Sequence, residues 1–490
     1  MNNKIYIGIT LGPIDRILNY SKSTRAIWAS SYMFSYIAKH IIDKYYKKGY
    51  NFLKPKITKD MFEFRDGVGR FPDQYIFQAD EDTSINDIRN ECDNLLEKLA
   101  ENIERVLELC DEKQRIFYYL KQTLRIIIVK QKFTEEKNEK EIIESLQDTL
   151  AGMECRDTFC AREKRNYLAE YFESTSSKSL LYTDGFGDDK EGRLFNTIIE
   201  CSAGKNAARN LNATLNDLIK GKLDEKLEPY QKYITFVSAD GDNFGKTLSL
   251  LGKKVKDVFD RYNKKINEIV SDYGGQIIYQ GGDDILFFAP VYNASKKKDI
   301  FSLITDIDTS FDTIIRSNVH IQSLKHKPSI SYGISVSYHK FPMYEARNMS
   351  AELLEKAKSS PNGKNKIYWN VRKHSGQSFG GEIDKSKSEL MSVNTNLISE
   401  AIVREEAFLH SVTHWLTSQE VMLTTILNKT QNERKSCLRN FIDNSFNESP
   451  HENCKDFFDK ISGYLLTYNS NEGIKQLHII MRYIELLIKK

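Results

Sequence analysis

The distribution of apolar residues along the chain predicts alternating strands and helices. Segments 4–12, 233–240 and 276–290 are short and rich in Ile, Val, Phe and Tyr, which is typical of buried strands. From residue 233 the pattern predicts a strand, a helix, a hairpin with a Gly-Gly turn, a helix, a strand, a helix and a last strand. This βαββαβαβ order favours an α+β, ferredoxin-like domain with one helical face.

The N-terminal part repeats the start of this pattern. A strand at 4–12 ends in glycine and is followed by a helical segment, as the strand at 233–240 is followed by a helix. The first copy has Gly8, Thr10 and Gly12 where the second copy has acids. If both copies share one fold, we expect the first to lack metal ligands.

Composition narrows the possible classes of protein. The chain has 71 Lys and Arg residues and 68 Asp and Glu residues. This near-balance of charge neither requires nor excludes binding to nucleic acid. Its seven cysteines are odd in number and scattered, which disfavours a disulfide framework and fits a reducing cytosol. No run approaches the roughly 18 apolar residues of a membrane helix, and the N-terminus reads as a strand. We therefore expect a cytoplasmic protein without membrane contact.

Carboxylates stand at the ends of two predicted strands. Asp240 ends one strand, and Asp283 and Asp284 begin the returning strand of the hairpin. If the hairpin pairs beside the first strand, the three carboxylates converge, and clustered oxygen ligands suit Mg²⁺. Two such ions can activate a hydroxyl and stabilise a departing pyrophosphate. The alternative is an ordinary hairpin turn and an acidic loop, and neighbouring strand residues normally face opposite sides.

The motif ADGDNFG followed by GGDD resembles the nucleotide cyclase and polymerase palm, including GGDEF domains. The fuller resemblance is to the large polymerase-cyclase subunit of type III-B (Cmr) CRISPR effectors. The segments GPIDRILNYSKSTRAIWASSYMFSYI, GVGRFPDQYIF and HKFPMYEARNMSAELLEKAK resemble its first-palm helix, first-palm hairpin and late palm helix. The resemblance covers most of residues 1–375 and implies two ferredoxin-like palm domains of the cyclase type.

The sequence pattern and the resemblance together predict a division of the chain into five regions. We expect a first, degenerate palm at 1–84, a helical insertion at 85–150, a degenerate zinc-finger-like linking region at 151–229, a second, catalytic palm at 230–375 and an all-α C-terminal domain at 380–490. Many relatives begin with an HD phosphohydrolase domain. This chain contains no His-Asp dipeptide, so we expect no nuclease of that kind.

Individual site residues follow from the same resemblance. Asp240 and Asp283 are expected to bind the metals, with Asp284 assisting and the carbonyl of Gly241 facing the metal. The residues expected to hold the nucleotide are glycines that let backbone approach phosphate, lysines that bind the triphosphate, and serines of the first palm, namely Gly281, Gly282, Lys358, Lys364, Ser30 and Ser31. The alternatives are surface lysines at a helix end and serines that only pack a helix.

Other motifs are weaker. Cys155, Cys160 and Cys201 are three thiols without a nearby histidine, which favours a degenerate finger over a filled zinc site. His410 and His414 are four residues apart on a predicted helix, a spacing that a metal could use, but ordinary core or surface histidines are the favoured interpretation.

The expected reaction is attack by an acceptor hydroxyl on the α-phosphate of ATP with release of pyrophosphate, dependent on two Mg²⁺ or Mn²⁺ ions. The product would be a second messenger for antiviral defence, either a cyclic oligoadenylate or AMP joined to S-adenosylmethionine. The expected partners are other Cmr subunits, CRISPR RNA and target RNA. A non-catalytic scaffold is one alternative. A diguanylate cyclase is another, disfavoured because Leu248 stands where GGDEF relatives carry a guanine-reading asparagine.

Overall fold

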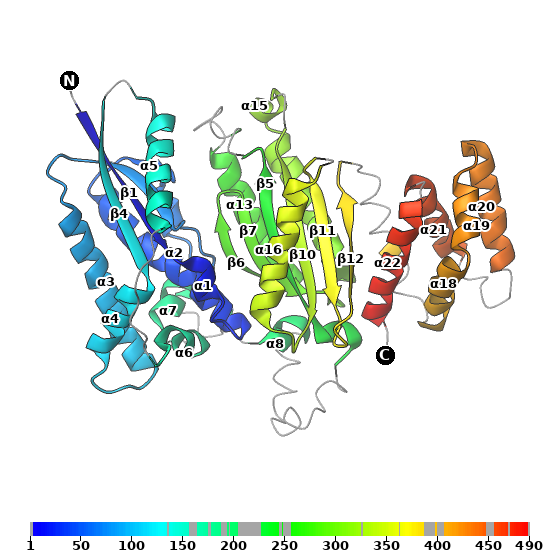
Figure 1. Ribbon diagram of the computed structural model, residues 1–490, viewed down its shortest axis with the longest axis horizontal. Coiled ribbons are helices and arrows are strands. Elements are labelled where there is room, and N and C mark those ends of the chain that lie inside the picture. Colours follow the sequence, from blue (N-terminus) through cyan, green and yellow to red (C-terminus); the bar gives the residue numbers. More distant parts are fainter. Residues whose placement is uncertain are drawn as a thin grey trace. The chain divides into compact units, whose positions relative to one another are not determined.

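The chain folds into two compact units, shown in a computed structural model (Figure 1). One comprises Met1–Thr197 with Ile277–Ile285, and the other comprises Ile198–Gln276 with Leu286–Lys490. The structure describes residues 3–134, 137–155, 164–174, 178–187, 194–195, 197–203, 227–244, 247, 256–324, 327–361, 363–386, 397–398, 406–446, 455–468 and 471–488.

The first unit contains a four-stranded sheet with the order β2-β3-β1-β4. Its strands are β1 (Asn3–Gly12), β2 (Phe52–Lys54), β3 (Gln74–Ala79) and β4 (Arg125–Thr134). Its helices are α1 (Ile14–Leu18), α2 (Thr24–Lys47), α3 (Ile85–Val106), α4 (Lys113–Thr123), α5 (Glu139–Glu154), α6 (Tyr167–Glu173) and α7 (Leu180–Phe186). Counting strands along the chain, the order is 2-3-1-4, which is the arrangement of a ferredoxin-like domain.

The region 85–150, expected to be a helical insertion, contains the fourth strand of this sheet. β4 pairs antiparallel with all ten residues of β1, from Asn3 opposite Thr134 to Gly12 opposite Arg125. The segment RIIIVKQKFT supplies a run of β-branched residues that favours a strand. The first ferredoxin-like domain therefore extends past residue 84 to at least Thr134.

Helix α2 is the centre of the first core. Ser23 caps it by accepting a hydrogen bond from the Ala26 amide, and most of its residues from Thr24 to Tyr45 are buried. Trp28 is completely buried, stacks on Tyr32 at 5.0 Å between ring centroids, and donates its indole N–H to the Gly67 carbonyl at 2.6 Å. The start of helix α2 is thus mainly a packing element.

The second unit is built on a six-stranded sheet with the order β12-β11-β10-β5-β7-β6. The strands are β5 (Tyr233–Asp242), β6 (Gln276–Gly281), β7 (Asp284–Pro290), β10 (Ser329–Tyr338), β11 (Lys366–Arg372) and β12 (Ser378–Asp384). Between them come α13 (Lys256–Tyr273), α14 (Ile300–Phe311) and α16 (Met343–Ser359). The order β5, α13, β6, β7, α14, β10, α16, β11 confirms the predicted sequence of elements.

Helices cover both faces of this sheet, whereas the sequence pattern suggested one helical face. Tyr332 and Gly333 are neighbours in β10 and therefore point to opposite faces. The Tyr332 hydroxyl donates to Asp308 of α14 at 2.9 Å, while a Cβ at Gly333 would lie 2.1 Å from the Ser350 carbonyl of α16. Helix α16 thus approaches the sheet closely because Gly333 has no side chain.

The sheet also has one strand more than expected, and the C-terminal helices belong to the same compact unit. β12 pairs with β11 and lies beyond residue 375, the expected end of this domain. The C-terminal helices are α18 (Glu406–Ser418), α19 (Glu420–Leu427), α20 (Gln431–Ser445), α21 (Lys455–Tyr468) and α22 (Asn471–Ile488). Tyr483 of α22 is fully buried, with ring centroids 5.3 Å from Phe301 and 5.7 Å from Trp369. This packing explains why these helices join the second domain rather than stand apart.

Within the described segments, no helix has the length and apolar character needed to span a membrane.

Candidate active site

Asp240 and Asp242 lie on one face of β5 at the end of the strand. They are two residues apart, so their side chains share a face, and antiparallel pairing sets them opposite Ser331 and Ser329 of β10. Asp240 is half-buried and Asp242 is completely buried. The strand core before them is apolar, so the acids emerge where the packed part of the strand ends.

The carboxylate of Asp240 binds the ammonium of Lys358, the last lysine of α16. Both side chains are about one-fifth exposed, at 21% and 22%. The hydroxyls of Ser238 and Ser350 are 2.8 Å apart and link β5 to α16 closer to the helix centre. The structure therefore brings together two residues that were predicted to act separately, as metal ligand and triphosphate ligand.

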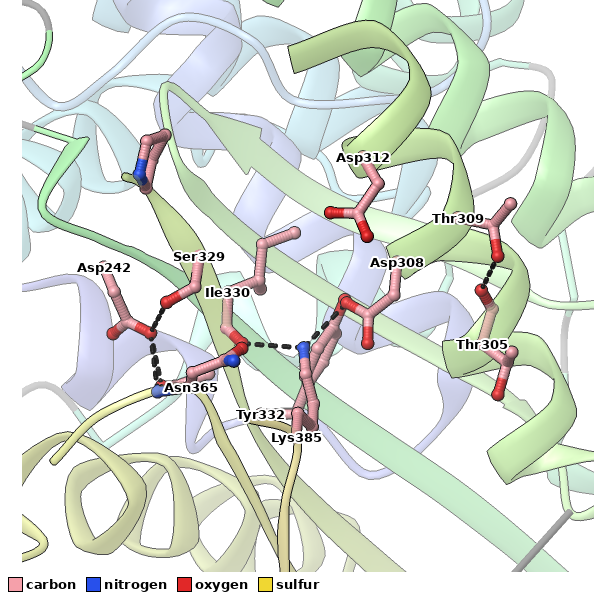
Figure 2. Close-up of polar contacts among 12 residues, drawn as sticks. Asp242, Thr305, Asp308, Thr309, Asp312, Ser329, Ile330, Tyr332, Asn365 and Lys385 are labelled. Carbon is pink, nitrogen blue, oxygen red and sulfur yellow. Dashed lines mark hydrogen bonds and ion pairs between the residues drawn. The ribbon is translucent and has the colours of Figure 1, made fainter. Parts of the chain in front are cut away.

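Asp242 is a buried acid that sequence reasoning did not single out. Its Oδ2 atom accepts hydrogen bonds from the Ser329 hydroxyl at 2.7 Å and the Asn365 amide at 2.9 Å (Figure 2). It also accepts one from the Ser331 hydroxyl at 2.8 Å. Its Oδ1 atom is buried without a hydrogen-bond partner among the described residues. The signal in the sequence was the alternation of Ser329 and Ser331 in β10, which sets two hydroxyls opposite the DGD segment.

The turn between α16 and β11 carries the other predicted lysine. Lys364 is exposed, and its neighbours Gly363 and Asn365 have φ angles of +90° and +67°. Asn365 is an uncommon non-glycine residue in this left-handed region. Gly241, whose carbonyl was predicted to face a metal, is buried in β5 opposite Ile330.

The GGDD segment forms a tight hairpin. β6 ends at Gly281 and β7 begins at Asp284, so Gly282 and Asp283 make a two-residue turn. Gly282 has a φ of +69°, which favours glycine. A Cβ at Gly281 would lie 1.8 Å from the hydroxyl of Tyr279. Asp283 is half-buried and Asp284 is exposed.

Within the first unit, which includes this hairpin tip, Asp283 acts electrostatically on Lys54. Burial lowers the pKa of the Lys54 ammonium below its ordinary 10.5, and the carboxylates of Asp73 and Asp283 oppose this shift. Burial likewise raises the pKa of Asp73. Lys54 was missed because its strand, β2, has only three residues and no clear periodicity.

A single metal held by all three predicted acids remains a prediction. Asp240 belongs to the second unit, whereas Asp283 and Asp284 belong to the hairpin tip that groups with the first. In the described part of the chain, no three His, Cys, Asp or Glu side chains are placed to hold a metal ion. The fit of Asp240 is supported by its chemistry, because this half-buried carboxylate already accepts a cation, the Lys358 ammonium.

The first domain lacks carboxylates at the matching strand positions. β1 pairs with β4 in the same way as β5 pairs with β10. In this comparison Thr10 takes the place of Asp240, and Gly12 takes the place of Asp242. The Thr10 hydroxyl donates to the Glu154 carboxylate at 2.5 Å. At these strand positions the first domain therefore offers no carboxylates of the kind that Asp240 and Asp242 supply in the second.

The structure gives Ser30 a packing role, in contrast to the predicted nucleotide contact. Ser30 is completely buried, and its hydroxyl lies 2.9 Å from that of Ser21 and donates to the Ile27 carbonyl at 3.0 Å. Ser31 is buried with 8% exposure. Both residues lie in the apolar interior around α2, so Ser30 offers no exposed atom to a ligand.

The remaining candidates are placed as follows. Cys155 is exposed, Cys201 is buried, and Cys160 and Leu248 lie outside the described residues. The Cys201 thiol contacts the Gly274 carbonyl at 3.8 Å, and burial raises the pKa of this thiol. His410 interacts with the Glu485 carboxylate at 3.3 Å across α18 and α22.

Comparison with known proteins identifies both domains. The model of the Cas10/Cmr2 second palm domain matches residues 233–368, and the N-terminal model of CRISPR-associated protein Cmr2 matches residues 6–108. No curated protein matches the chain.

Solved structures show the same fold at low identity. A Csm1-Csm4 cassette in complex with cA4 is 13% identical over 99% of this chain and 70% of that chain, with a TM-score of 0.51. A Csm1-Csm4 cassette in complex with pppApA gives the same values. A type III-B Cmr-beta structure in the apo state is 10% identical over 77% of this chain and 70% of that chain, with a TM-score of 0.46. Residues 6–108 therefore match the N-terminal region of Cmr2, and residues 233–368 match the second palm domain of the Cas10/Cmr2 family of CRISPR-associated proteins.

Proposed function

We propose that this chain is the nucleotidyltransferase subunit of a type III-B CRISPR effector and that it uses ATP to make an adenylate-based second messenger when target RNA is bound. The observation that carries the proposal is Asp240, a half-buried carboxylate at the strand end of the second palm that takes a cation. Proposed partners are other Cmr subunits, CRISPR RNA and target RNA. Support for nucleotide use comes from the matched Csm1-Csm4 cassettes, which are in complex with cA4 and pppApA.

The residues that would hold a divalent metal, Mg²⁺ or Mn²⁺, are Asp240, Asp283 and Asp284, with the carbonyl of Gly241. When bound, such an ion neutralises charge on the phosphates and favours ionisation of the acceptor hydroxyl. In the reaction, the acceptor oxygen forms a bond to the α-phosphorus of ATP, the bond from that phosphorus to the pyrophosphate oxygen breaks, and the hydroxyl proton leaves to water. Most of the rate enhancement in such transfers comes from positioning and charge stabilisation.

The lysines of the second unit supply fixed positive charge for the triphosphate. Lys364 is exposed in the turn after α16, and Lys358 lies at the end of that helix. Lys358 is bound to Asp240, so it must leave this carboxylate to contact phosphate. At the hairpin, the side-chain-free Gly282 has open space around it, which lets the backbone approach a phosphate closely.

A non-catalytic scaffold is the second candidate, and one observation favours it. The Lys358 ammonium occupies the carboxylate that a metal needs. If this ion pair persisted with ATP present, the chain would bind its partner subunits and RNA without catalysing a reaction.

The test is to incubate the assembled complex with labelled ATP, target RNA and Mg²⁺ or Mn²⁺, with and without S-adenosylmethionine. Mass spectrometry of the products distinguishes cyclic oligoadenylate, AMP conjugate and no product. Asp240→Asn should abolish any product, whereas Asp443→Asn, an exposed helical acid paired with Arg439, is the matched control and should leave it unchanged. Unaltered ATP in the wild-type reaction would support the scaffold.

A further inference from the structure

Asp242 holds the turn that follows α16. Its carboxylate has no exposed surface, yet three donors converge on its Oδ2 atom. Two are hydroxyls of β10, and the third is the backbone amide of Asn365, which is remote in sequence and lies directly before β11. The Ser331 hydroxyl also accepts from the same amide at 3.1 Å, so the amide of Asn365 is bound twice.

The opposite side of the Asn365 residue is anchored as well. Its carbonyl accepts a hydrogen bond from the Lys385 amide at 3.0 Å. The Lys385 ammonium, only 7% exposed, donates to Asp308 at 2.7 Å and to the Ile330 carbonyl at 2.8 Å (Figure 2). It also lies 4.4 Å from the centre of the Tyr332 ring. The turn is therefore clamped between Asp242 on one side and Lys385 on the other.

The buried carboxylate of Asp242 would destabilise the fold if it did not link these groups. A buried carboxylate is destabilising when unpaired and is stabilised by hydrogen bonds from several donors. Removal of the carboxylate would leave the Ser329 hydroxyl without this acceptor and the Asn365 amide with only its longer bond to the Ser331 hydroxyl. Asn365 also has a φ of +67°, a conformation that needs support from its surroundings.

We propose that Asp242 is a positioning residue, which fixes the distance between Asp240 and the turn that carries Lys364. The proposal rests on the proposed function, because it assigns Lys364 and Lys358 to the triphosphate. Asp242 sits two residues from Asp240 on one rigid strand and binds the residue next to Lys364. One carboxylate thus couples the acid that would bind metal to the cation that would bind phosphate.

The test compares four variants in the assembled complex by steady-state ATP conversion. Asp242→Ala should raise the KM for ATP about tenfold and change kcat far less, since the chemistry-bearing Asp240 remains. Asp242→Asn keeps an acceptor oxygen of the same shape and should restore most of the affinity. Ser331→Ala is a milder variant in case Asp242→Ala does not fold, and it should raise the KM by a smaller factor. Ser238→Ala removes a buried hydrogen bond of the same strand away from the turn and is the matched control.

A second readout needs no catalysis and separates this proposal from the proposed function. Trypsin cleavage after the exposed Lys364 should accelerate about tenfold in Asp242→Ala and remain at the wild-type rate in Asp242→Asn and Ser238→Ala. If wild-type complex converts no ATP, the proposed function fails while the cleavage rates still test the clamp. Equal cleavage rates in all folded variants, or an unchanged KM in Asp242→Ala and Ser331→Ala, would overturn the assignment of Asp242.

Discussion

The ammonium of Lys358 binds the carboxylate of Asp240 across the gap between α16 and β5. The pair is about four-fifths buried, so each charge is partly desolvated and benefits from the other. A metal and an ATP phosphate would separate them, with the metal taking Asp240 and the phosphate taking Lys358. The ion pair thus joins two groups that we assign to one nucleotide site.

Lys358→Ala should have opposite effects on metal and nucleotide. Without the competing ammonium, Asp240 should bind Mn²⁺ more tightly in the absence of ATP, by about 1 kcal/mol or roughly fivefold in Kd. The KM for ATP should rise, because a phosphate contact is lost. Titration calorimetry with Mn²⁺ and steady-state ATP conversion measure the two effects. Lys356→Ala, an exposed lysine in the same turn of α16, is the control and should change neither.

Gly333→Ala should displace α16 from the sheet. A Cβ at this position would lie 2.1 Å from the Ser350 carbonyl and 2.3 Å from the Leu354 amide, and both are backbone atoms that cannot rotate away. We expect a destabilisation of about 1–3 kcal/mol or more and a loss of ATP conversion, because Lys358 moves with the helix. Thermal unfolding and activity measure this.

The comparison for that variant is Gly463→Ala in α21, where a Cβ would meet no heavy atom within 4 Å. This substitution should preserve or raise stability by about 0.5–1 kcal/mol, since alanine favours a helix. A Gly333→Ala protein as stable and active as Gly463→Ala would show that α16 does not set the geometry of the site.

Asp299 should make the stability of the second unit depend on pH. This acid caps α14 by accepting from the Ser302 amide at 3.0 Å and hydroxyl at 2.6 Å, but its burial raises its pKa above the ordinary 3.8. Between 3.8 and that raised pKa the folded chain binds more protons than the unfolded chain, so the contribution of Asp299 to stability falls as pH rises through this interval.

Asp299→Asn retains a capping side chain and cannot ionise. The melting temperature of the variant, minus that of the wild type, should therefore increase as pH rises from about 4 to 7. Differential scanning calorimetry at several pH values measures this difference. A difference that is constant with pH, or that shrinks, would contradict the assignment of Asp299 as a buried acid with a raised pKa.

Local patterns predicted the second domain well because its elements are separate and typical. The strand-and-helix order from β5 to β11 is confirmed, since each strand is bounded by turn residues. β4 was missed because it lies between charged helical segments and its partner β1 is more than 100 residues away in the chain. β12 was missed because Gly380 and Gly381 make SFGGEID read as a loop. The structure explains Gly380 by close packing, as a Cβ there would lie 2.0 Å from the Trp369 carbonyl.

The sequence allowed an acid of the candidate site to be assigned, but it did not show which residues the acids contact. Asp240 could be assigned from its place at a strand end, but Lys358 is 118 positions away and only the packing of α16 brings it to Asp240. Asp242 looked like part of an acidic loop, because burial depends on β10 and on the turn before β11. The burial of Ser30 could not be predicted, because a helix pattern does not show whether a serine faces the core or a ligand.

Nucleotide choice tests the inference from Leu248. GGDEF-type relatives use an asparagine at this place to read guanine, and leucine has no hydrogen-bonding group to do so. We expect the assembled complex to convert ATP and to leave GTP unused under the same conditions. Chromatography of the products of parallel reactions measures this, and equal turnover of the two nucleotides would remove the basis for choosing adenine.

The most direct measurement of the central claim is the conversion of labelled ATP by complexes that carry Asp283→Ala with Asp284→Ala, beside wild type and Asp240→Asn. All are assembled with target RNA and Mg²⁺ or Mn²⁺. Loss of the acids removes ligands of a metal ion whose charge would stabilise the transition state by several kcal/mol. Both variants should therefore lose at least about a hundredfold in rate. The double variant should retain its folding and assembly, because the neighbouring acids Asp283 and Asp284 repel each other without a metal. Asp240→Asn should retain them because the amide keeps the shape of the side chain. Near-normal product from the double variant, in a folded and assembled complex, would contradict the assignment of these acids to the active site.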